Sequence, residues 1–566
     1  MTKNVQPVTS GALYLNQDRK VAVLDYNENY IKNIFELINS DELKSVVNQF
    51  LNSRNQFERK SRFDETDVDT YLETLKAIVL DQDNAFAKFD RADILASIED
   101  LYSFYRSFLR VSTINLHSNN VVASGFMDID NRFNELVIDL YRTIEEKLQG
   151  HANKTYRQVN AGTNACVLTQ TIDWPAPAGY EKLKTVRFLD TLMLRPPMMM
   201  HTKSNKREGV FSAVENNPIT KFDGSREEWY CFPAKIGESI AYIYFHRDYF
   251  VSGLSLANLF EVADCKKVEG QKPDLILLFG LQETEDGVSH YYHDEANDIW
   301  VGEVPYNDKT TYFGYMKKMC LTLHNLHMID KGNLPIHGSM VRISFSNDKN
   351  KTVVFFGDSG AGKSESIEAL QEIADDKIIS METIFDDMGS FTLTDEGAGL
   401  YAQGTETGAF VRLDDLSSAV AFNNMDRGVY LNPELSNARV IIPANAFERV
   451  VEHHEIDMWV YANNYSDEIG LHRFDDKDEA KETFISGKRR ALGTTDEVGM
   501  TTTFFANPFG PVQEEAKTRP IIDNVFDKLY ANDTYVGEIY THLGNDKSKS
   551  SLNESAQELL NVLMNS

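Results

Sequence analysis

The most informative stretch of this sequence is Thr352-Val353-Val354-Phe355-Phe356-Gly357-Asp358-Ser359-Gly360-Ala361-Gly362-Lys363-Ser364. Its first five residues are β-branched or aromatic and predict a buried strand. The segment that follows has the spacing Gly-x-x-x-x-Gly-Lys-Ser, and the apolar residues after it (Ile367, Ala369, Leu370) suit the start of a helix. A strand, a glycine-rich turn and a helix in this order are the setting in which such a motif binds phosphate groups.

The glycine-rich segment predicts a nucleotide site for physical reasons. Glycines let the backbone wrap so that several N–H groups point at one anion, and a helix N-terminus adds positive potential. We expect Lys363 to reach the outer phosphates and the Ser364 hydroxyl to bind a metal ion. The predicted nucleotide-binding residues are Gly357, Asp358, Ser359, Gly360, Ala361, Gly362, Lys363 and Ser364.

A metal ion beside the phosphates needs hard oxygen ligands. Two aspartate pairs follow the glycine-rich segment, Asp375-Asp376 and Asp386-Asp387. We prefer the later pair because it follows the strand-like residues Ile384-Phe385, so that a second strand would deliver a carboxylate. The earlier pair, which is closer to the loop, stays open as the alternative.

Outward from this segment the chain divides into three regions. Residues 331–566 are predicted to form a P-loop domain that binds nucleotide and metal. Residues 151–330 are predicted to form a mixed α/β domain, because short β-branched and aromatic segments such as 240–245 and 274–279 occur there. Residues 1–150 carry apolar residues at helical spacing and predict a helical accessory region. The predicted fold class is therefore α/β with an added helical N-terminal region.

The composition excludes several classes of function. The 566 residues include 57 basic and 86 acidic ones, and the net charge of −29 would repel nucleic acid. We expect no membrane partner, because no apolar stretch is long enough to span a bilayer and no signal peptide is recognisable. The four cysteines form no Cys-x-x-Cys pair, so we expect reduced thiols in a cytoplasmic protein. A small anionic substrate is compatible with the charge, because it needs only a local basic pocket.

Several segments together resemble the phosphoenolpyruvate carboxykinases, especially the ATP-dependent class. They occur in that family's order over roughly residues 300–510. The segments are Tyr312-Phe313-Gly314-Tyr315-Met316-Lys317-Lys318-Met319, Ile336-His337-Gly338-Ser339, the glycine-rich loop, Ile384-Phe385-Asp386-Asp387, Glu396-Gly397-Ala398-Gly399-Leu400-Tyr401-Ala402, Asn437-Ala438-Arg439, and Phe484-Ile485-Ser486-Gly487 with Gly493-Thr494 and Thr503-Phe504 beyond. The resemblance implies a two-lobed α/β core that contains the P-loop domain.

The resemblance also implies a site for two metal ions. In the family a divalent ion, usually Mn²⁺, is held by a neutral lysine, a histidine and an aspartate, and the matching residues here are Lys318, His337 and Asp387. A lysine can bind a metal only when it is deprotonated, and the adjacent Lys317 would help to lower its pKa. A second ion, normally Mg²⁺, would accompany the nucleotide at Ser364.

The same resemblance assigns catalytic roles. Lys317 and Arg439 would contact the transferred phosphoryl group, and a planar guanidinium is well suited to neutralise its charge. Tyr312 would flank the substrate, and Ser359 would lie in the loop between the two reactants. The implied reaction is decarboxylation of oxaloacetate to an enolate, whose oxygen is then phosphorylated.

Recognition of the organic acid departs from the family pattern. The family holds the substrate carboxylate with an arginine, and the nearest stretch here is His201-Thr202-Lys203-Ser204-Asn205-Lys206-Arg207. Lys203 stands at the arginine position, and Arg207 is the nearby residue that could replace it. A lysine offers a point charge instead of a two-pronged contact. The predicted substrate-binding residues are Tyr312, Lys203, Arg207 and Arg439.

Two other readings stay open. The loop is also close to that of HPr kinase/phosphorylase, which phosphorylates a protein serine, and there Asp386 or Asp376 would act as the base toward a hydroxyl. A nucleotide-binding regulatory protein without catalysis is the third reading. The family's adenine-binding segment has no match, so ATP, GTP and pyrophosphate all remain candidate donors. The sequence does not indicate the oligomeric state.

Overall fold

The computed structural model describes most of the chain, which forms two compact units, Met1–Asn153 with Gln158–Gly162 and Lys154–Arg157 with Thr163–Ser566. The described ranges are 8–17, 21–25, 31–53, 61–82, 86–106, 109–113, 126–156, 165–194, 196–224, 228–282, 287–374, 377–394, 399–413, 422–492, 498–543 and 550–565. No helix in these ranges is both long and apolar enough to cross a membrane. The mixed α/β class expected from the sequence is confirmed at this coarse level.

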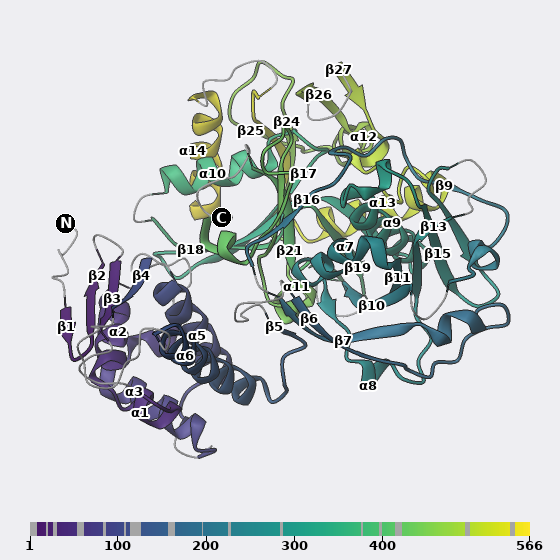
Figure 1. Ribbon diagram of the computed structural model, residues 1–566. Coiled ribbons are helices and arrows are strands. Elements are labelled where there is room, and N and C mark those ends of the chain that lie inside the picture. The colour runs from purple at the N-terminus through teal and green to yellow at the C-terminus, as the bar shows by residue number, and fades with distance from the viewer. Residues whose placement is uncertain are drawn as a thin grey trace. The chain divides into compact units, whose positions relative to one another are not determined.

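The first unit combines helices with a small sheet (Figure 1). Its helices are α1 (Ile34–Ile38), α2 (Asp41–Asn52), α3 (Val68–Val79), α5 (Arg91–Arg106) and α6 (Phe126–Gln149). The sheet has the strand order β1-β2-β3-β4, with β1 (Val8–Ser10), β2 (Leu13–Asn16), β3 (Val21–Asp25) and β4 (Leu109–Thr113). The sequence predicts only helices here. Strands of three to five residues carry too little alternation to stand out beside long amphipathic helices.

The helices of the first unit begin at residues suited to that position. The Ser40 side chain accepts a hydrogen bond from the Leu43 amide at the start of α2, and Asp67 does the same for Thr70 at the start of α3. Their apolar faces meet around Phe50, which packs against other buried rings of the unit. Local capping and helical periodicity therefore account for this layer of the unit.

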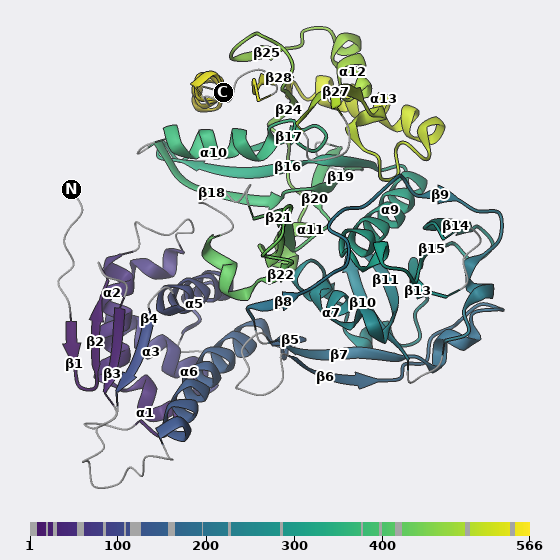
Figure 2. The same ribbon diagram turned by 45° about the horizontal axis from the view of Figure 1, so that its top comes forward.

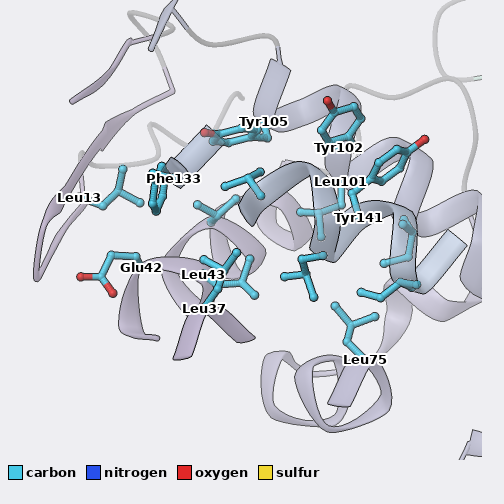
Figure 3. Close-up of a pocket in the computed structure, with 15 residues that line it drawn as sticks. Leu13, Leu37, Glu42, Leu43, Leu75, Leu101, Tyr102, Tyr105, Phe133 and Tyr141 are labelled. Atoms are coloured by element: carbon cyan, nitrogen blue, oxygen red, sulfur yellow. The ribbon is translucent and has the colours of Figure 1, made fainter. Parts of the chain in front are cut away.

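The first unit also contains an apolar pocket of about 100 Å³ between its helices and β2 (Figure 3). Its lining side chains are Leu13, Leu37, Glu42, Leu43, Val46, Leu75, Ile98, Leu101, Tyr102, Tyr105, Phe133, Val137, Leu140, Tyr141 and Ile144. The rings of Tyr102 and Tyr141 stack with centroids 4.1 Å apart. The Glu42 carboxylate at its edge accepts a hydrogen bond from the Ala12 amide at 2.8 Å.

The second unit contains a large mixed sheet with the main order β5-β7-β10-β11-β13-β15-β14-β9. The strands of this sheet are β5 (Thr155–Tyr156), β6 (Ala165–Gln170), β7 (Arg187–Leu194), β9 (Ser212–Ala213), β10 (Trp229–Ile236), β11 (Ser239–His246), β12 (Glu261–Val262), β13 (Leu275–Leu281), β14 (His290–Asp294) and β15 (Ile299–Pro305). Strands β11, β13 and β15 are parallel, and every residue of β13 is buried, as expected for the apolar run noted in the sequence.

A second sheet has the order β20-β19-β16-β17-β24-β28-β25, and β18 also pairs with β16. Its strands are β16 (Leu334–Phe345), β17 (Asn350–Phe356), β18 (Ile378–Phe385), β19 (Met388–Leu393), β20 (Leu400–Gly404), β24 (Met458–Asn463), β25 (Leu471–Arg473) and β28 (Tyr535–Tyr540). Strand β17 is buried on both faces. Val353 and Phe355 pack toward α10 (Lys363–Ile373) and α14 (Ser550–Asn565), whereas Phe356 packs toward α12 (Lys477–Ser486) and α13 (Glu515–Ala531).

Helix α9 (Gly314–Asp330) joins the two sheets into one body (Figure 2). It contacts β13 and β15 of the first sheet and β16 of the second, and nearly all of its residues are buried. A helix that is covered on every side lacks a polar face, which explains its weak amphipathic pattern. The sequence predicts a domain boundary near residue 330, but the structure has one compact unit there because α9 packs on both sheets.

A smaller third sheet, in the order β21-β23-β22-β8, completes the surroundings of the candidate site. Its strands are β8 (Met198–Met200), β21 (Gly408–Arg412), β22 (Val429–Leu431) and β23 (Arg439–Pro443). A separate hairpin consists of β26 (Lys488–Leu492) and β27 (Val498–Thr502). The short helices are α7 (Phe250–Ser255), α8 (Cys265–Val268) and α11 (Phe447–Val451).

Candidate functional site

The glycine-rich loop connects the end of β17 at Phe356 to the start of α10 at Lys363. Gly362 precedes the helix with a φ of +105°, and a Cβ there would lie 2.7 Å from the Thr541 side chain. Both observations require glycine at this position. The loop therefore places successive backbone amides and a helix N-terminus at one end of the second sheet, where an anion would find positive potential.

Lys363 lies inside the loop that precedes it. Its ammonium donates to the carbonyl oxygens of Gly357 at 2.7 Å and Asp358 at 3.1 Å, and burial lowers the pKa of Lys363. The exposed Ser359 donates its backbone N–H to the Asp358 carboxylate at 2.7 Å. For phosphate groups to bind here, the Lys363 ammonium and the Ser359 amide would have to exchange their hydrogen bonds to oxygens of the loop for hydrogen bonds to phosphate oxygens.

Asp386 and Asp387 follow the end of β18 and lie beside the loop. The Asp386 carboxylate accepts a hydrogen bond from Ser339 at 2.8 Å and a longer one from Ser364 at 3.4 Å. Burial raises the pKa of Asp386. This contact brings the Ser364 hydroxyl and a carboxylate together, as a metal ion bound with a nucleotide would require. The rival pair Asp375-Asp376 lies outside the described residues.

Lys317 and Lys318, in the first turns of α9, meet at the carboxylate of Asp387. The Asp387 Oδ2 atom lies 2.7 Å from the Lys317 Nζ and 2.6 Å from the Lys318 Nζ. His337, on β16, brings its Nε2 to 3.3 Å from the other oxygen of Asp387. Residues from α9, β16 and the β18–β19 turn therefore converge on one carboxylate.

The two lysines differ in their electrostatic surroundings. Burial, together with the neighbouring Lys317 charge, lowers the pKa of Lys318 to about 8. Burial opposes the charge of Lys317 as well, but Asp387 and Glu406 outweigh it and raise the pKa of that lysine. Burial also acts against ionisation of Asp387, yet the cations around it hold its pKa well below the usual range. Lys318 is thus the lysine that gives up its proton more readily.

His337 is oriented so that one ring nitrogen faces Asp387 as an acceptor. Its Nδ1 lies 2.7 Å from the carbonyl oxygen of Ala506, which can only accept, so Nδ1 carries the proton. Burial lowers the pKa of His337, which keeps the ring neutral. The Nε2 lone pair and an Asp387 oxygen then face each other across 3.3 Å without a proton between them. Two facing acceptors at this distance favour a cation.

Lys318, His337 and Asp387 could together hold a divalent metal ion. Within the described ranges no group of three His, Cys, Asp or Glu side chains is placed to hold a metal ion. His337 and Asp387 supply two such donors, and Lys318, with its lowered pKa, supplies the third. Lys318, His337 and Asp387 are also the three residues that the resemblance implies as metal ligands.

Cationic side chains and two phenylalanine rings form the wall beside the lysine pair. The Arg439 guanidinium lies 5.1 Å from the ring centre of Phe410, and the Lys317 Nζ lies 5.8 Å from the same centre. Burial raises the pKa of Tyr312, and the nearby charges of Arg439, Lys317 and Arg207 partly oppose that effect. Tyr312 and Arg439 therefore lie where an anionic substrate would meet Lys317.

Arg207, and not Lys203, faces this wall. The Arg207 guanidinium lies 5.1 Å from the ring centre of Phe509, and the Lys318 Nζ lies 4.6 Å from the same ring. Lys203 points elsewhere, since its ammonium pairs with Asp308 at 2.8 Å on the surface. The predicted residues Lys317, Lys318, His337, Asp387, Tyr312, Arg439 and Arg207 are thus gathered together, whereas Lys203 is not.

Two buried ionic residues of the site, Arg489 and Glu406, are not among the residues predicted from the sequence. Arg489 donates to the Asp358 carboxylate at 3.0 Å and to the Ser359 carbonyl at 2.7 Å, and so fixes the glycine-rich loop from β26. Glu406 pairs with Lys317 at 3.0 Å and has a side chain that is only 4% exposed. A signal for Glu406 does exist, because the stretch Gly404-Thr405-Glu406-Thr407-Gly408 places a carboxylate between two glycines.

The chain matches no known protein-family model, and no curated protein shows significant similarity to it. Any function assigned to the chain therefore has to come from its own residues.

Proposed function

We propose that this protein is an enzyme of the phosphoenolpyruvate carboxykinase type, which decarboxylates oxaloacetate and phosphorylates the resulting enolate from a nucleotide or another phosphoryl donor. The observation that carries the proposal is the convergence of Lys318, His337 and Asp387, with Lys317 beside them. A nucleotide-dependent kinase that acts on a hydroxyl group does not need two lysines on one carboxylate, as the buried Lys317 and the partly exposed Lys318 are here. A carboxykinase needs one as a metal ligand and the other beside the phosphoryl group.

The phosphoryl donor would bind at the glycine-rich loop. The loop amides and Lys363 would hold the outer phosphates, and Ser364 with Asp386 would hold Mg²⁺. The chain contains no recognisable adenine-binding segment, so the donor is ATP, GTP or pyrophosphate. Arg489 supports this role. Its hydrogen bonds to Asp358 and Ser359 would hold the loop backbone in place when Lys363 leaves the loop carbonyls and contacts phosphate.

The organic acid would bind beside the lysine pair. The sequence leaves two candidates for the carboxylate contact, Lys203 and Arg207. Arg207 would make this contact, because its guanidinium lies at the Phe509 ring, as the Lys318 ammonium does. Arg439 and Tyr312 also lie near Lys317 and would orient the reacting end. These cations overcome locally the repulsion that a chain with a net charge of −29 exerts on an anion.

The reaction has two steps. The bond between the β-carboxylate carbon and the neighbouring methylene carbon of oxaloacetate breaks, and CO₂ leaves. The electron pair of this bond moves toward the carbonyl group, so that negative charge collects on the carbonyl oxygen and the enolate forms. This oxygen then bonds to the outer phosphorus of the donor, whose bond to the leaving phosphate breaks. Mn²⁺ held by Lys318, His337 and Asp387 would supply charge stabilisation at the enolate oxygen. Lys317 and Arg439 place positive charge beside the moving phosphoryl group.

The test is product formation. Purified protein is incubated with Mn²⁺, Mg²⁺, oxaloacetate and, in separate reactions, ATP, GTP or pyrophosphate, and phosphoenolpyruvate is measured. We expect phosphoenolpyruvate with one donor and none without Mn²⁺ or without oxaloacetate. Absence of phosphoenolpyruvate with all three donors, from protein that binds nucleotide, would overturn the proposal.

A kinase of the same general fold is the second candidate. The observation that favours it is Asp386, a half-buried carboxylate with a raised pKa that contacts Ser339 and Ser364 beside the loop. Such a group could take the proton from an attacking hydroxyl. Phosphorylation of a protein serine from ATP, in reactions where oxaloacetate gives no product, would favour this candidate.

A further inference from the structure

Glu406 is a buried carboxylate in the candidate site to which the carboxykinase resemblance gives no role. It lies in the short link between β20 of the second sheet and β21 of the third. Its Oε1 atom lies 3.0 Å from the Lys317 Nζ, and the two side chains are 4% and 2% exposed. A charge so far from water has to be paired, and Glu406 is one of the two carboxylates that contact the Lys317 ammonium.

The link that carries Glu406 is held by hydrogen bonds on both sides. The Thr405 hydroxyl donates to the Met388 carbonyl at 3.0 Å, and the Thr405 carbonyl accepts from the Gly237 amide at 3.1 Å. The Thr407 amide donates to the Leu259 carbonyl at 2.7 Å. The backbone on either side of Glu406 is thereby tied to separate parts of the second unit.

Gly408 closes the link. A Cβ at this residue would lie 1.7 Å from the carbonyl oxygen of Asn258, so no larger residue fits without moving the backbone. The link therefore has little freedom to shift, and Glu406 presents its carboxylate from a fixed position. Fixed supporting groups of this kind are what hold a reactive side chain in a productive geometry.

Lys317 depends on Glu406 because its other carboxylate partner is shared. The same Oδ2 atom of Asp387 contacts the ammonium groups of Lys317 and Lys318, at 2.7 Å and 2.6 Å. In the proposed function Asp387 also serves the metal ion. An oxygen that is engaged by the metal holds Lys317 less strongly, and Glu406 is then the carboxylate dedicated to this lysine.

We propose that Glu406 is the positioning residue of Lys317, which it holds in place beside the substrate while Asp387 serves the metal. This inference rests on the proposed function. Burial raises the pKa of Glu406 to about 7 against the opposing charge of Lys317, and the ionised carboxylate places a negative charge beside a site that would take anions. Its removal therefore misplaces Lys317 and, at the same time, makes the pocket more positive.

These two effects separate in steady-state kinetics. Misplacing Lys317 lowers kcat, because its contact is made with the moving phosphoryl group. A more positive pocket does not weaken binding of the anionic substrate, so KM stays the same or falls. A residue with a merely structural role would instead lower the amount of folded protein and leave kcat per active site unchanged.

The experiment compares Glu406→Gln, which removes the charge but keeps an acceptor, with Glu406→Met, which removes both at similar length. The matched control is Glu303→Gln. Glu303 is fully buried and pairs with Lys221 at 3.0 Å, but it lies on β15 in the first sheet, away from the lysine pair. We expect kcat to fall by at least about tenfold in E406Q and further in E406M, with KM for oxaloacetate not raised, and E303Q to stay within about twofold of wild type.

A kcat within about twofold of wild type in both Glu406 variants would overturn the inference while the proposed function stands. If the wild-type protein forms no phosphoenolpyruvate, the proposed function fails by itself, and crystal structures then decide about Glu406. A Lys317 side chain that leaves its position in E406M supports the inference. An unmoved Lys317 in E406M refutes it, whatever the reaction.

Discussion

The charge at Asp387 holds the candidate site together, and its removal has a predictable cost. Asp387→Asn keeps the size of the side chain but leaves the Lys317 and Lys318 ammonium groups without the carboxylate that both contact. Breaking a buried ion pair by removing one partner costs about 3–5 kcal/mol. Three features reduce the cost here. The Asp387 side chain is 28% exposed to solvent. Glu406 still pairs with Lys317, and Lys318, whose pKa is already lowered to about 8, can lose its proton. We therefore expect a loss of about 3 kcal/mol, at the lower end of that range.

The assay is chemical denaturation in the presence of a chelator, followed by tryptophan fluorescence. All four tryptophans, Trp174, Trp229, Trp300 and Trp459, belong to the second unit, so the signal reports unfolding of the unit that contains the site. The control is Asp533→Asn, which removes an exposed ion pair with Arg473 and should leave stability nearly unchanged. A loss below about 1 kcal/mol in D387N would refute the reasoning, because it would mean that the lysine pair does not depend on this carboxylate.

The remaining predictions concern binding and pH. In steady-state assays, Arg207→Ala should raise KM for the organic acid by at least about tenfold, whereas Lys203→Ala should leave KM within about twofold of wild type. Equal effects of the two substitutions would contradict the placement of Arg207 in the site. His337→Ala should weaken Mn²⁺ binding, measured by electron paramagnetic resonance, by at least about tenfold, and unaltered affinity would remove His337 from the site. Lys363→Ala should abolish nucleotide binding in calorimetry, and persistent binding would show that the loop is not the phosphate site. Burial lowers the pKa of His324 to about 3, below its unfolded value of 6.5, so the folded state disfavours its protonation. Stability from this group is present above pH 6.5 and is lost as the pH falls toward 3, by up to about 1.4 kcal/mol per pH unit, and denaturation of His324→Gln should show a flatter pH dependence than wild type.

The sequence predicts the parts of the site that lie in one continuous segment. The glycine-rich loop between a strand and a helix can be read from local pattern alone, and β17 and α10 occur where the pattern places them. Lys317, Lys318, His337 and Asp387 could be named from their order along the chain. That they meet within hydrogen-bonding distance depends on α9, β16 and the β18–β19 turn packing together, which no local pattern encodes.

Residues brought in by long-range packing could not be predicted in this way. Lys203 and Arg207 lie four residues apart in one irregular stretch, and only the fold shows that Arg207 faces Phe509 while Lys203 pairs with Asp308. Glu406 reaches Lys317 because a link between two sheets is fixed by contacts with distant residues. The small sheet of the first unit was missed for another reason, since its strands are short and the helical pattern around them is strong.

The fate of the outer phosphoryl group of the donor tests the proposed function most directly. Wild-type protein and Lys317→Met are incubated with Mn²⁺, Mg²⁺, oxaloacetate and ATP that carries a radioactive label in its γ-phosphate, or with labelled GTP or pyrophosphate if that is the donor used. We predict that the label appears in phosphoenolpyruvate only when oxaloacetate is present, and that Lys317→Met nearly abolishes this transfer. Label that appears only in inorganic phosphate or on protein, with or without oxaloacetate, would contradict a carboxykinase-type reaction at this site.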